Sequence, residues 1–178
     1  MAPVRTRNRA AGLALACALI AGPATAIAAP PDPDPVSPLL WATIDVCDTP
    51  AHPDTIGIRG SMPGTGDAHE RMYMEFVVEY RGPTGHWHYL SHGESGFVAV
   101  GRASARARQA GEDFELARGA TDTYTLRGVV VFEWRAKGTT IAQEVRATRT
   151  GHPAAVGADP PGYSAALCTI TRKAAGRS

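Results

Sequence analysis

Two segments of this chain alternate between apolar and polar side chains with a period of two, and no other feature limits the possible fold as strongly. In residues 72–80, one side of an extended backbone carries Met72, Met74, Phe76, Val78 and Tyr80. In residues 124–136, the corresponding side carries Tyr124, Leu126, Gly128, Val130, Phe132, Trp134 and Ala136. Successive side chains of a strand point to opposite faces, whereas a helix requires a period of about 3.6. Both segments are therefore predicted to be half-buried strands.

Shorter segments separated by turn residues extend this pattern. They are residues 41–48, 56–62, 86–90, 97–100, 104–109, 113–117, 139–149 and 165–171. The segments 104–109 and 113–117 are predicted to form a hairpin around Ala110 and Gly111. About eight or nine short strands with intervening turns are typical of an all-β antiparallel β-sandwich, and a small β-barrel is the alternative.

The N-terminus has the order of features found in a secretory signal peptide. Arg5, Arg7 and Arg9 precede an apolar run over residues 10–21, and small residues suited to cleavage follow. A retained membrane anchor and a lipoprotein modified at Cys17 are the alternatives. The apolar run is short for a membrane span, and the residues before the cysteine are out of order for lipid attachment. The chain is therefore predicted to be secreted by a bacterial cell, with no membrane insertion after processing.

The predicted organisation is simple. A signal peptide covers residues 1–29, a Pro-rich linker residues 30–38, a single domain residues 39–173, and a disordered tail residues 174–178. Prolines at alternate positions of the linker exclude a helix and favour an extended chain. About 150 residues are enough to build one hydrophobic core.

Two cysteines, Cys47 and Cys168, remain after removal of the signal peptide and lie near opposite ends of the predicted domain. In an exported protein, such a pair is interpreted first as a disulfide, with two free thiols as the alternative. The bond would join the first strand of the domain to the last.

The charge balance excludes some classes of partner. The full chain has 18 Lys and Arg and 17 Asp and Glu, and removing three signal-peptide arginines leaves 15 basic residues and a net charge of −2. Nucleic acids and anionic membranes attract strongly basic proteins. A nucleic-acid partner is therefore not expected.

A cluster of histidines is the first candidate site. His86 and His88 would point to one side of a strand, and His92 could return from the following turn. Imidazole nitrogens are common ligands of zinc and copper. The alternative is a set of solvated histidines opposite Trp87 and Tyr89, which would then take the core face.

Methionines suggest a second possible metal site. Met62, Met72 and Met74 with His69 could supply soft ligands for Cu(I). Because Met72 and Met74 are in register with Phe76 on one face, their interpretation as core residues is preferred.

A row of arginines is the third candidate. Arg102, Arg106 and Arg108 would lie on one face of a strand and could bind sulfate, phosphate or an acidic polysaccharide. Arginines on an edge strand also protect it from pairing with other chains, and this second interpretation needs no ligand.

Motifs for catalysis are weak. A hydrolase triad of Ser95, His92 and Asp113 is conceivable on residue type alone. A glycosidase pair could come from Glu70, Glu75, Glu79 and Glu133, although Glu75 and Glu79 are expected on the solvated face of their strand. These observations leave enzymatic activity open and favour its absence.

Parts of the sequence resemble immunoglobulin-like and fibronectin type III-like sandwiches. The resemblance is carried by Gly85-His86-Trp87 with Tyr89, which look like a core tryptophan strand, and by residues 124–131, which look like a long central strand. It covers about residues 70–150, and the cysteines depart from the immunoglobulin pattern because neither lies in those strands. The chain also resembles uncharacterised exported proteins of high-GC actinobacteria. These resemblances imply export and a compact β fold, and they imply no activity.

The combined expectation is an exported, non-enzymatic binding or structural module whose ligand is a surface component or another protein. Loops at residues 92–96 and 157–162 are the expected interaction surfaces, because sandwiches carry recognition on loops. The alternative function is an exported protein that binds zinc or copper through His86, His88 and His92.

Overall fold

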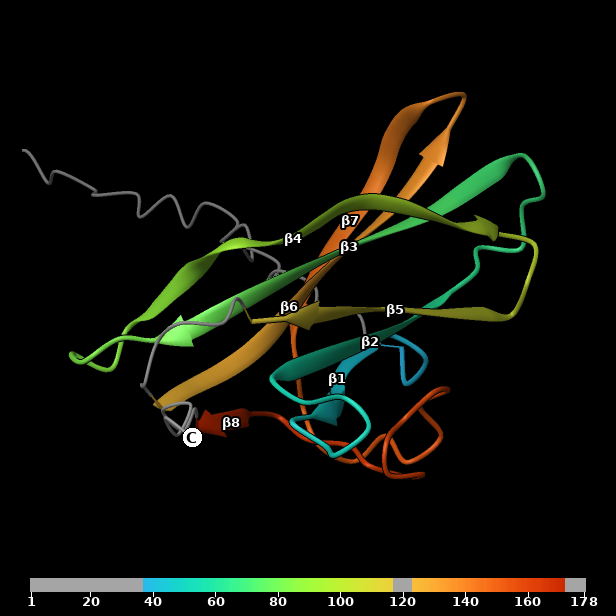
Figure 1. Cartoon of the computed structure of the whole chain (residues 1–178). Coiled ribbons are helices and arrows are strands. Elements are labelled where there is room, and N and C mark those ends of the chain that lie inside the picture. Colours follow the sequence, from blue (N-terminus) through green and yellow to red (C-terminus); the bar gives the residue numbers. More distant parts are fainter. Residues whose placement is uncertain (1–36, 117–122, 172–178) are drawn as a thin grey trace, which may run out of the picture. The chain divides into compact units, whose positions relative to one another are not determined.

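A computed structural model describes residues 37–116 and 123–171, and every regular element in these ranges is a β-strand (Figure 1). The strands are β1 Trp41–Cys47, β2 Thr55–Pro63, β3 Glu70–Arg81, β4 Trp87–Arg102, β5 Ala107–Glu115, β6 Thr123–Ala136, β7 Thr139–Ala147 and β8 Cys168–Thr171. The prediction of an all-β protein is therefore confirmed. No helix in the described ranges could cross a membrane. The predicted signal peptide, linker residues 30–36 and the tail lie outside the described residues.

The strands form two antiparallel sheets. The smaller sheet has the order β1-β2-β5, and the larger has the order β4-β3-β6-β7 with β8 also paired to β6. Hydrophobic side chains from both sheets form one core, in the manner of a β-sandwich. The closed single sheet of a barrel is not the arrangement of these residues.

Strand β6 organises the larger sheet. One of its edges pairs with β3 in an uninterrupted register from Glu70–Ala136 to Tyr80–Leu126. Its other edge pairs first with β8 over residues 123–126 and then with β7 over residues 129–136. In Figure 1 the β6–β7 hairpin rises away from the three-stranded sheet. This explains why most of the β7 side chains are exposed.

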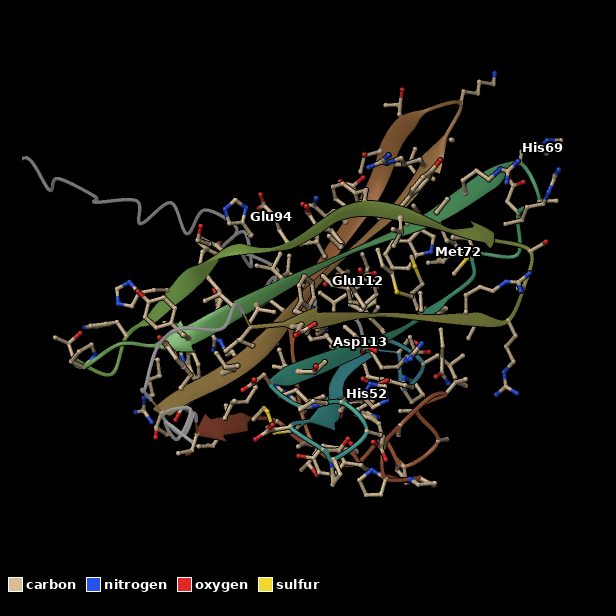
Figure 2. All side chains as sticks on the ribbon, viewed as in Figure 1. His52, His69, Met72, Glu94, Glu112 and Asp113 are labelled. Atoms are coloured by element: carbon tan, nitrogen blue, oxygen red, sulfur yellow. A yellow bond between two sulfur atoms is a disulfide. The ribbon has the colours of Figure 1, made fainter. Side chains whose placement is uncertain are left out.

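The core confirms the faces predicted from the period-two pattern. The fully buried side chains of the larger sheet include Met72, Met74, Phe76, Val78, Leu126, Val130 and Phe132, and the smaller sheet contributes Ile44, Ile56, Ile58 and Met62. The methionines therefore serve as core residues, as the preferred interpretation holds (Figure 2 labels Met72). Burial of these side chains is the main force that holds the two sheets together.

Two predicted strands, residues 86–90 and 97–100, are in fact parts of the single strand β4. The register between β3 and β4 shifts at three places, so β4 carries extra residues in bulges. Gly93 is buried where a Cβ would lie 3.1 Å from the Cβ of Val78. The glycine and serine residues that suggested a loop at 92–96 instead allow the strand to bend, and the prediction of a recognition loop there is wrong.

The predicted hairpin around Ala110 and Gly111 is also wrong, because β5 runs straight through both residues and pairs with β2 without interruption. Gly111 is opposite Arg59, and a Cβ on this glycine would lie 2.7 Å from the Arg59 Cζ. The glycine is therefore needed for close approach of a neighbouring side chain, and no turn is present.

The disulfide prediction is confirmed. Cys47 at the end of β1 is bonded to Cys168 at the start of β8, across a sequence separation of 121 residues. Between β7 and β8, residues 148–167 run beside β1, where Ile44 and Ala165 exchange backbone hydrogen bonds of 2.9 and 3.0 Å. A buried disulfide is compatible with an extracytoplasmic protein.

Candidate functional site

A groove lies where β1 and β7 meet. Here the backbone N–H of Arg149 donates a hydrogen bond of 2.8 Å to the carbonyl oxygen of Ala42. The groove beside this bond has a volume of about 530 Å³, which is within the size range of small-ligand pockets. Its lining comes from two segments of the chain, and the residues are Ser37, Pro38, Leu40, Trp41 and Ala42 from the first and Val145, Arg146, Ala147, Arg149 and His152 from the second.

An aromatic pair stiffens the groove. The rings of Trp41 and His152 are stacked with centroids 4.5 Å apart and planes inclined by 10°. The backbone N–H of His152 donates to the Ser164 hydroxyl at 2.9 Å, and that hydroxyl is 2.7 Å from the Thr43 hydroxyl. Burial lowers the pKa of His152 below its ordinary value of 6.5, so the imidazole is neutral at neutral pH. The two stacked rings thus present a flat surface that carries no charge at neutral pH.

The charge of the groove comes from two arginines. Arg146 is engaged, because its guanidinium donates to Glu144 and to the Val145 carbonyl, both at 2.8 Å. The guanidinium of Arg149 has no hydrogen bond or ion pair to any residue in the described ranges. The groove lining contains no carboxylate. A guanidinium beside apolar rings is suited to a ligand that carries a carboxylate or another planar anion.

The predicted histidine cluster lies elsewhere. His86 precedes β4, His88 stacks on Tyr80 with ring centroids 5.4 Å apart, and His92 is in a bulge with φ of 59°. All three are exposed. Among the described residues, no group of three or more His, Cys, Asp or Glu side chains is arranged to hold a metal ion. Zinc or copper binding by these histidines stays a prediction, which calorimetric titration with either metal would test.

The face predicted for the neighbouring aromatic residues is wrong. Tyr89 is 75% exposed, and Trp87 lies on the outer face of the larger sheet, where the Arg127 guanidinium is 4.4 Å from its ring centroid. Both residues precede the bulges of β4. Their register partners, Arg81 and Glu79, lie on the face of β3 opposite Val78 and Phe76, so this end of β4 directs its aromatic side chains away from the core.

The arginine row does not exist as one face of a strand. Arg102 ends β4, Arg106 lies in the connection that follows, and Arg108 belongs to β5. The Arg102 guanidinium donates to the Ala68 carbonyl at 3.2 Å. Binding of an anion by these three arginines stays a prediction, but the strand geometry proposed for it is wrong.

The conceivable hydrolase triad is split between the sheets. Ser95 and His92 belong to β4 of the larger sheet, whereas Asp113 belongs to β5 of the smaller sheet (Figure 2 labels Asp113). The Ser95 hydroxyl accepts from the Phe76 N–H at 2.9 Å and donates to the Gly96 carbonyl at 2.7 Å. The hydroxyl therefore forms hydrogen bonds with backbone groups at a bulge, where the regular pairing of the strands is interrupted.

Glutamates of the larger sheet are less solvated than expected. Glu79 is buried and pairs with Arg127 at 2.6 Å, so its expected place on a solvated face is wrong. Glu133 is buried and pairs with Arg135 at 2.6 Å. The Arg135 guanidinium also lies 4.2 Å from the ring centroid of Tyr73 and 4.7 Å from that of Phe97. These carboxylates therefore have structural partners.

Sequence patterns do not reveal the groove, because Trp41, Arg149 and His152 lie near opposite ends of the domain and share no local motif. Their only local signal is a tryptophan at the start of a strand and a histidine in a turn-rich segment. No protein-family model matches the sequence, and no curated protein matches it at a significant level.

Proposed function

We propose that this protein is an exported, non-enzymatic binding module that takes an anionic ligand in the groove between β1 and β7. The observation that carries the proposal is the Arg149 guanidinium, which lies in a groove of about 530 Å³ without a partner in the described ranges. A carboxylate that reaches it would form a charge-assisted hydrogen bond, and the stacked Trp41 and His152 rings would contact the apolar part of the ligand.

Export is supported by the N-terminal sequence pattern and by the compatible Cys47–Cys168 disulfide. An immunoglobulin-like relationship is part of the proposal and is supported by the two packed antiparallel sheets. The disulfide argues for a variant of that pattern, because it joins the terminal strands β1 and β8.

The test is binding of the folded protein, with its disulfide intact, to an array of carboxylated glycans, neutral glycans, acidic peptides and basic peptides. We expect binding to acidic probes only. The substitution Arg149→Ala should weaken it by about ten-fold, which corresponds to loss of a charged hydrogen bond. Trp41→Ala should also weaken binding, because it removes the stacked ring surface.

The matched control is Arg71→Ala, which removes an exposed arginine of β3 outside the groove. It changes net charge by the same amount as Arg149→Ala, so it separates the groove from general electrostatic attraction. Equal binding by both variants, or binding to none of the probes, would overturn the proposal.

A further inference from the structure

Strand β7 has an edge that pairs with no other strand in the described ranges. Within the described ranges it is the last strand of the larger sheet and pairs along its length with β6 alone. Such an edge carries backbone N–H and C=O groups that can pair with another extended chain. The groove lies along the second half of this edge, because Val145, Arg146 and Ala147 are part of its lining.

The register identifies which backbone groups are directed away from β6. The Thr148 N–H donates to the carbonyl of Gly128 at 2.9 Å, so these two residues form a hydrogen-bonded pair. In an antiparallel ladder, hydrogen-bonded and non-hydrogen-bonded pairs alternate. The next pairs are Ala147 with Val129, Arg146 with Val130, and Val145 with Val131. The N–H and C=O groups of Val145 and Ala147 therefore point away from β6.

The same edge already accepts a partner at one position. Arg149 continues the alternation, and its N–H is the group that bonds the carbonyl of Ala42 in β1. At this residue, just beyond the end of β7, the edge therefore takes a backbone partner from the smaller sheet. Val145 and Ala147 line the groove, so there is open space beside this part of the edge.

The edge is protected against unselective pairing. The Arg146 guanidinium donates to the Val145 carbonyl, and the register with β6 shifts between Trp134 and Arg135, which leaves Ile141 in a bulge. Both features are devices that discourage pairing between identical edges. These two features make self-association of β7 less favourable. A single short ligand strand that also makes side-chain contacts is the favoured partner.

We infer that the ligand of the groove is an acidic peptide segment, which adds to β7 in an extended conformation along Val145 and Ala147. This inference rests on the proposed function and specifies its partner. Backbone hydrogen bonds to β7 would supply affinity, and an acidic side chain on Arg149 would supply selectivity. The Arg149 guanidinium, which has no partner in the described ranges, and a lining without carboxylates favour an acidic over a basic segment.

Amide hydrogen exchange followed by NMR tests the inference directly. The probes are a short blocked peptide of alternating valine and glutamate, its lysine analogue, and an N-methylated form of the acidic peptide. In the free protein, the amides of Glu144 and Arg146 should be protected by β6, whereas those of Val145 and Ala147 should exchange fast. The acidic peptide should slow exchange of Val145 and Ala147 by on the order of ten-fold.

The outcomes separate this inference from the proposed function. Two outcomes would overturn strand addition and leave the groove as a ligand site. In the first, a carboxylated glycan binds and its binding depends on Arg149. In the second, the acidic peptide binds with the same dependence on Arg149 but does not protect the amides of Val145 and Ala147. Equal binding of the N-methylated peptide also overturns strand addition. If no probe depends on Arg149, both proposals fail. A change to a dimer in light scattering, with protection at Val145 in the absence of peptide, would show a second copy of this chain as the occupant and overturn the peptide assignment.

Discussion

The carboxylate of Asp45 has one oxygen bound and the other without a partner. Its Oδ2 accepts a hydrogen bond of 2.8 Å from the Arg59 Nε, whereas its buried Oδ1 has no hydrogen-bond partner among the described residues. The Asp45 side chain is only 1% exposed. A Cβ on Gly57 would lie 2.8 Å from this Oδ1 and 2.6 Å from the Asp113 Oδ1, so the two carboxylates flank the same point above the glycine. A buried carboxylate in this position is costly to ionise.

Asp45 should make stability depend on pH. Burial raises the pKa of its carboxyl above the ordinary value of 3.8, and the negative charge of Asp113 raises it further. The hydrogen bond and the positive charge of Arg59 lower this pKa, but they do not outweigh burial. Because the folded pKa is the higher one, this contribution to stability is fully present below pH 3.8 and is lost as pH rises through the folded pKa. Asp45→Asn should therefore be at least as stable as the original protein at neutral pH. This advantage should shrink as pH falls, as measured by urea unfolding over a pH series.

Asp45→Ala is the matched control for that experiment. It leaves Arg59 without its carboxylate partner, and it should lower the free energy of unfolding by about 2 kcal/mol at neutral pH. An asparagine variant as unstable as the alanine variant at neutral pH would contradict the prediction.

Glu133 should act in the opposite direction. Burial raises its pKa, but hydrogen bonds from Arg135, Thr140 and Gln143 outweigh this and lower it below the ordinary value of 4.5. The ionised form is thus favoured in the folded state, and its contribution to stability is present above pH 4.5 and lost as pH falls through the folded pKa. Glu133→Gln should destabilise the protein by about 1–3 kcal/mol at neutral pH, with less effect under acidic conditions. Urea unfolding at neutral and at acidic pH measures this difference. The control is Glu144→Gln, which alters an exposed ion pair and should change the free energy of unfolding little.

Affinity of the groove for acidic probes should increase as pH falls. Protonation of His152 adds a positive charge beside Arg149, and it occurs below pH 6.5 because the pKa of this histidine is lowered. Carboxylate ligands stay ionised down to about pH 4. Calorimetric titration with the acidic peptide should show this increase in the original protein and a flat profile in His152→Asn. If the affinity of His152→Asn still increased as pH falls, the pH dependence would have to come from another titratable group.

The disulfide should be a major contributor to stability. Closure of a loop of 121 residues stabilises a folded protein by about 4–5 kcal/mol in the chain-entropy account. The double substitution of Cys47 and Cys168 by serine should lower the free energy of unfolding by an amount of this order. The original protein unfolded in urea with a reductant should approach the same value. Agreement between oxidised and reduced protein would contradict a structural role for the bond.

Gly111→Ala should destabilise β5 although it replaces one small residue with another. The new Cβ would lie 2.7 Å from the Arg59 Cζ and 2.8 Å from the backbone oxygen of Ile58. We expect a loss of about 1–3 kcal/mol, measured by thermal or urea unfolding. Glu112→Ala on the neighbouring exposed position is the control and should have a much smaller effect.

The sequence allowed prediction of β3, β6 and the disulfide. The disulfide followed from the two cysteines that remain after the predicted signal peptide, whereas the two strands share another physical reason. Both strands pair over long, regular registers and bury one face, so their alternation survives in the folded protein. Strand β4 could not be predicted as one element, because its bulges interrupt the alternation and place a glycine and a serine in mid-strand. The role of Gly111 depends on Arg59, which belongs to another strand.

The groove could not be predicted for a related reason. Trp41 and His152 are brought together only when β1 meets the segment after β7, and the partner of the Arg149 N–H is the backbone of Ala42. Contacts between residues so far apart leave no periodic trace in a single sequence. The predicted histidine and arginine clusters, by contrast, consist of residues that are close in sequence. The bulges of β4 separate the histidines, and the turn between β4 and β5 separates the arginines.

The division of one edge of β6 between β8 and β7 determines how the protein would carry mechanical load. A force applied to the chain end beyond β8 would pass into residues 123–126 of β6 and, through Cys168 and Cys47, into β1 of the other sheet. The β6–β7 hairpin lies outside this path, whereas the groove borders it on the side formed by β1. Tension on that end would therefore be shared by both sheets while the ligand-facing edge of β7 stays unloaded.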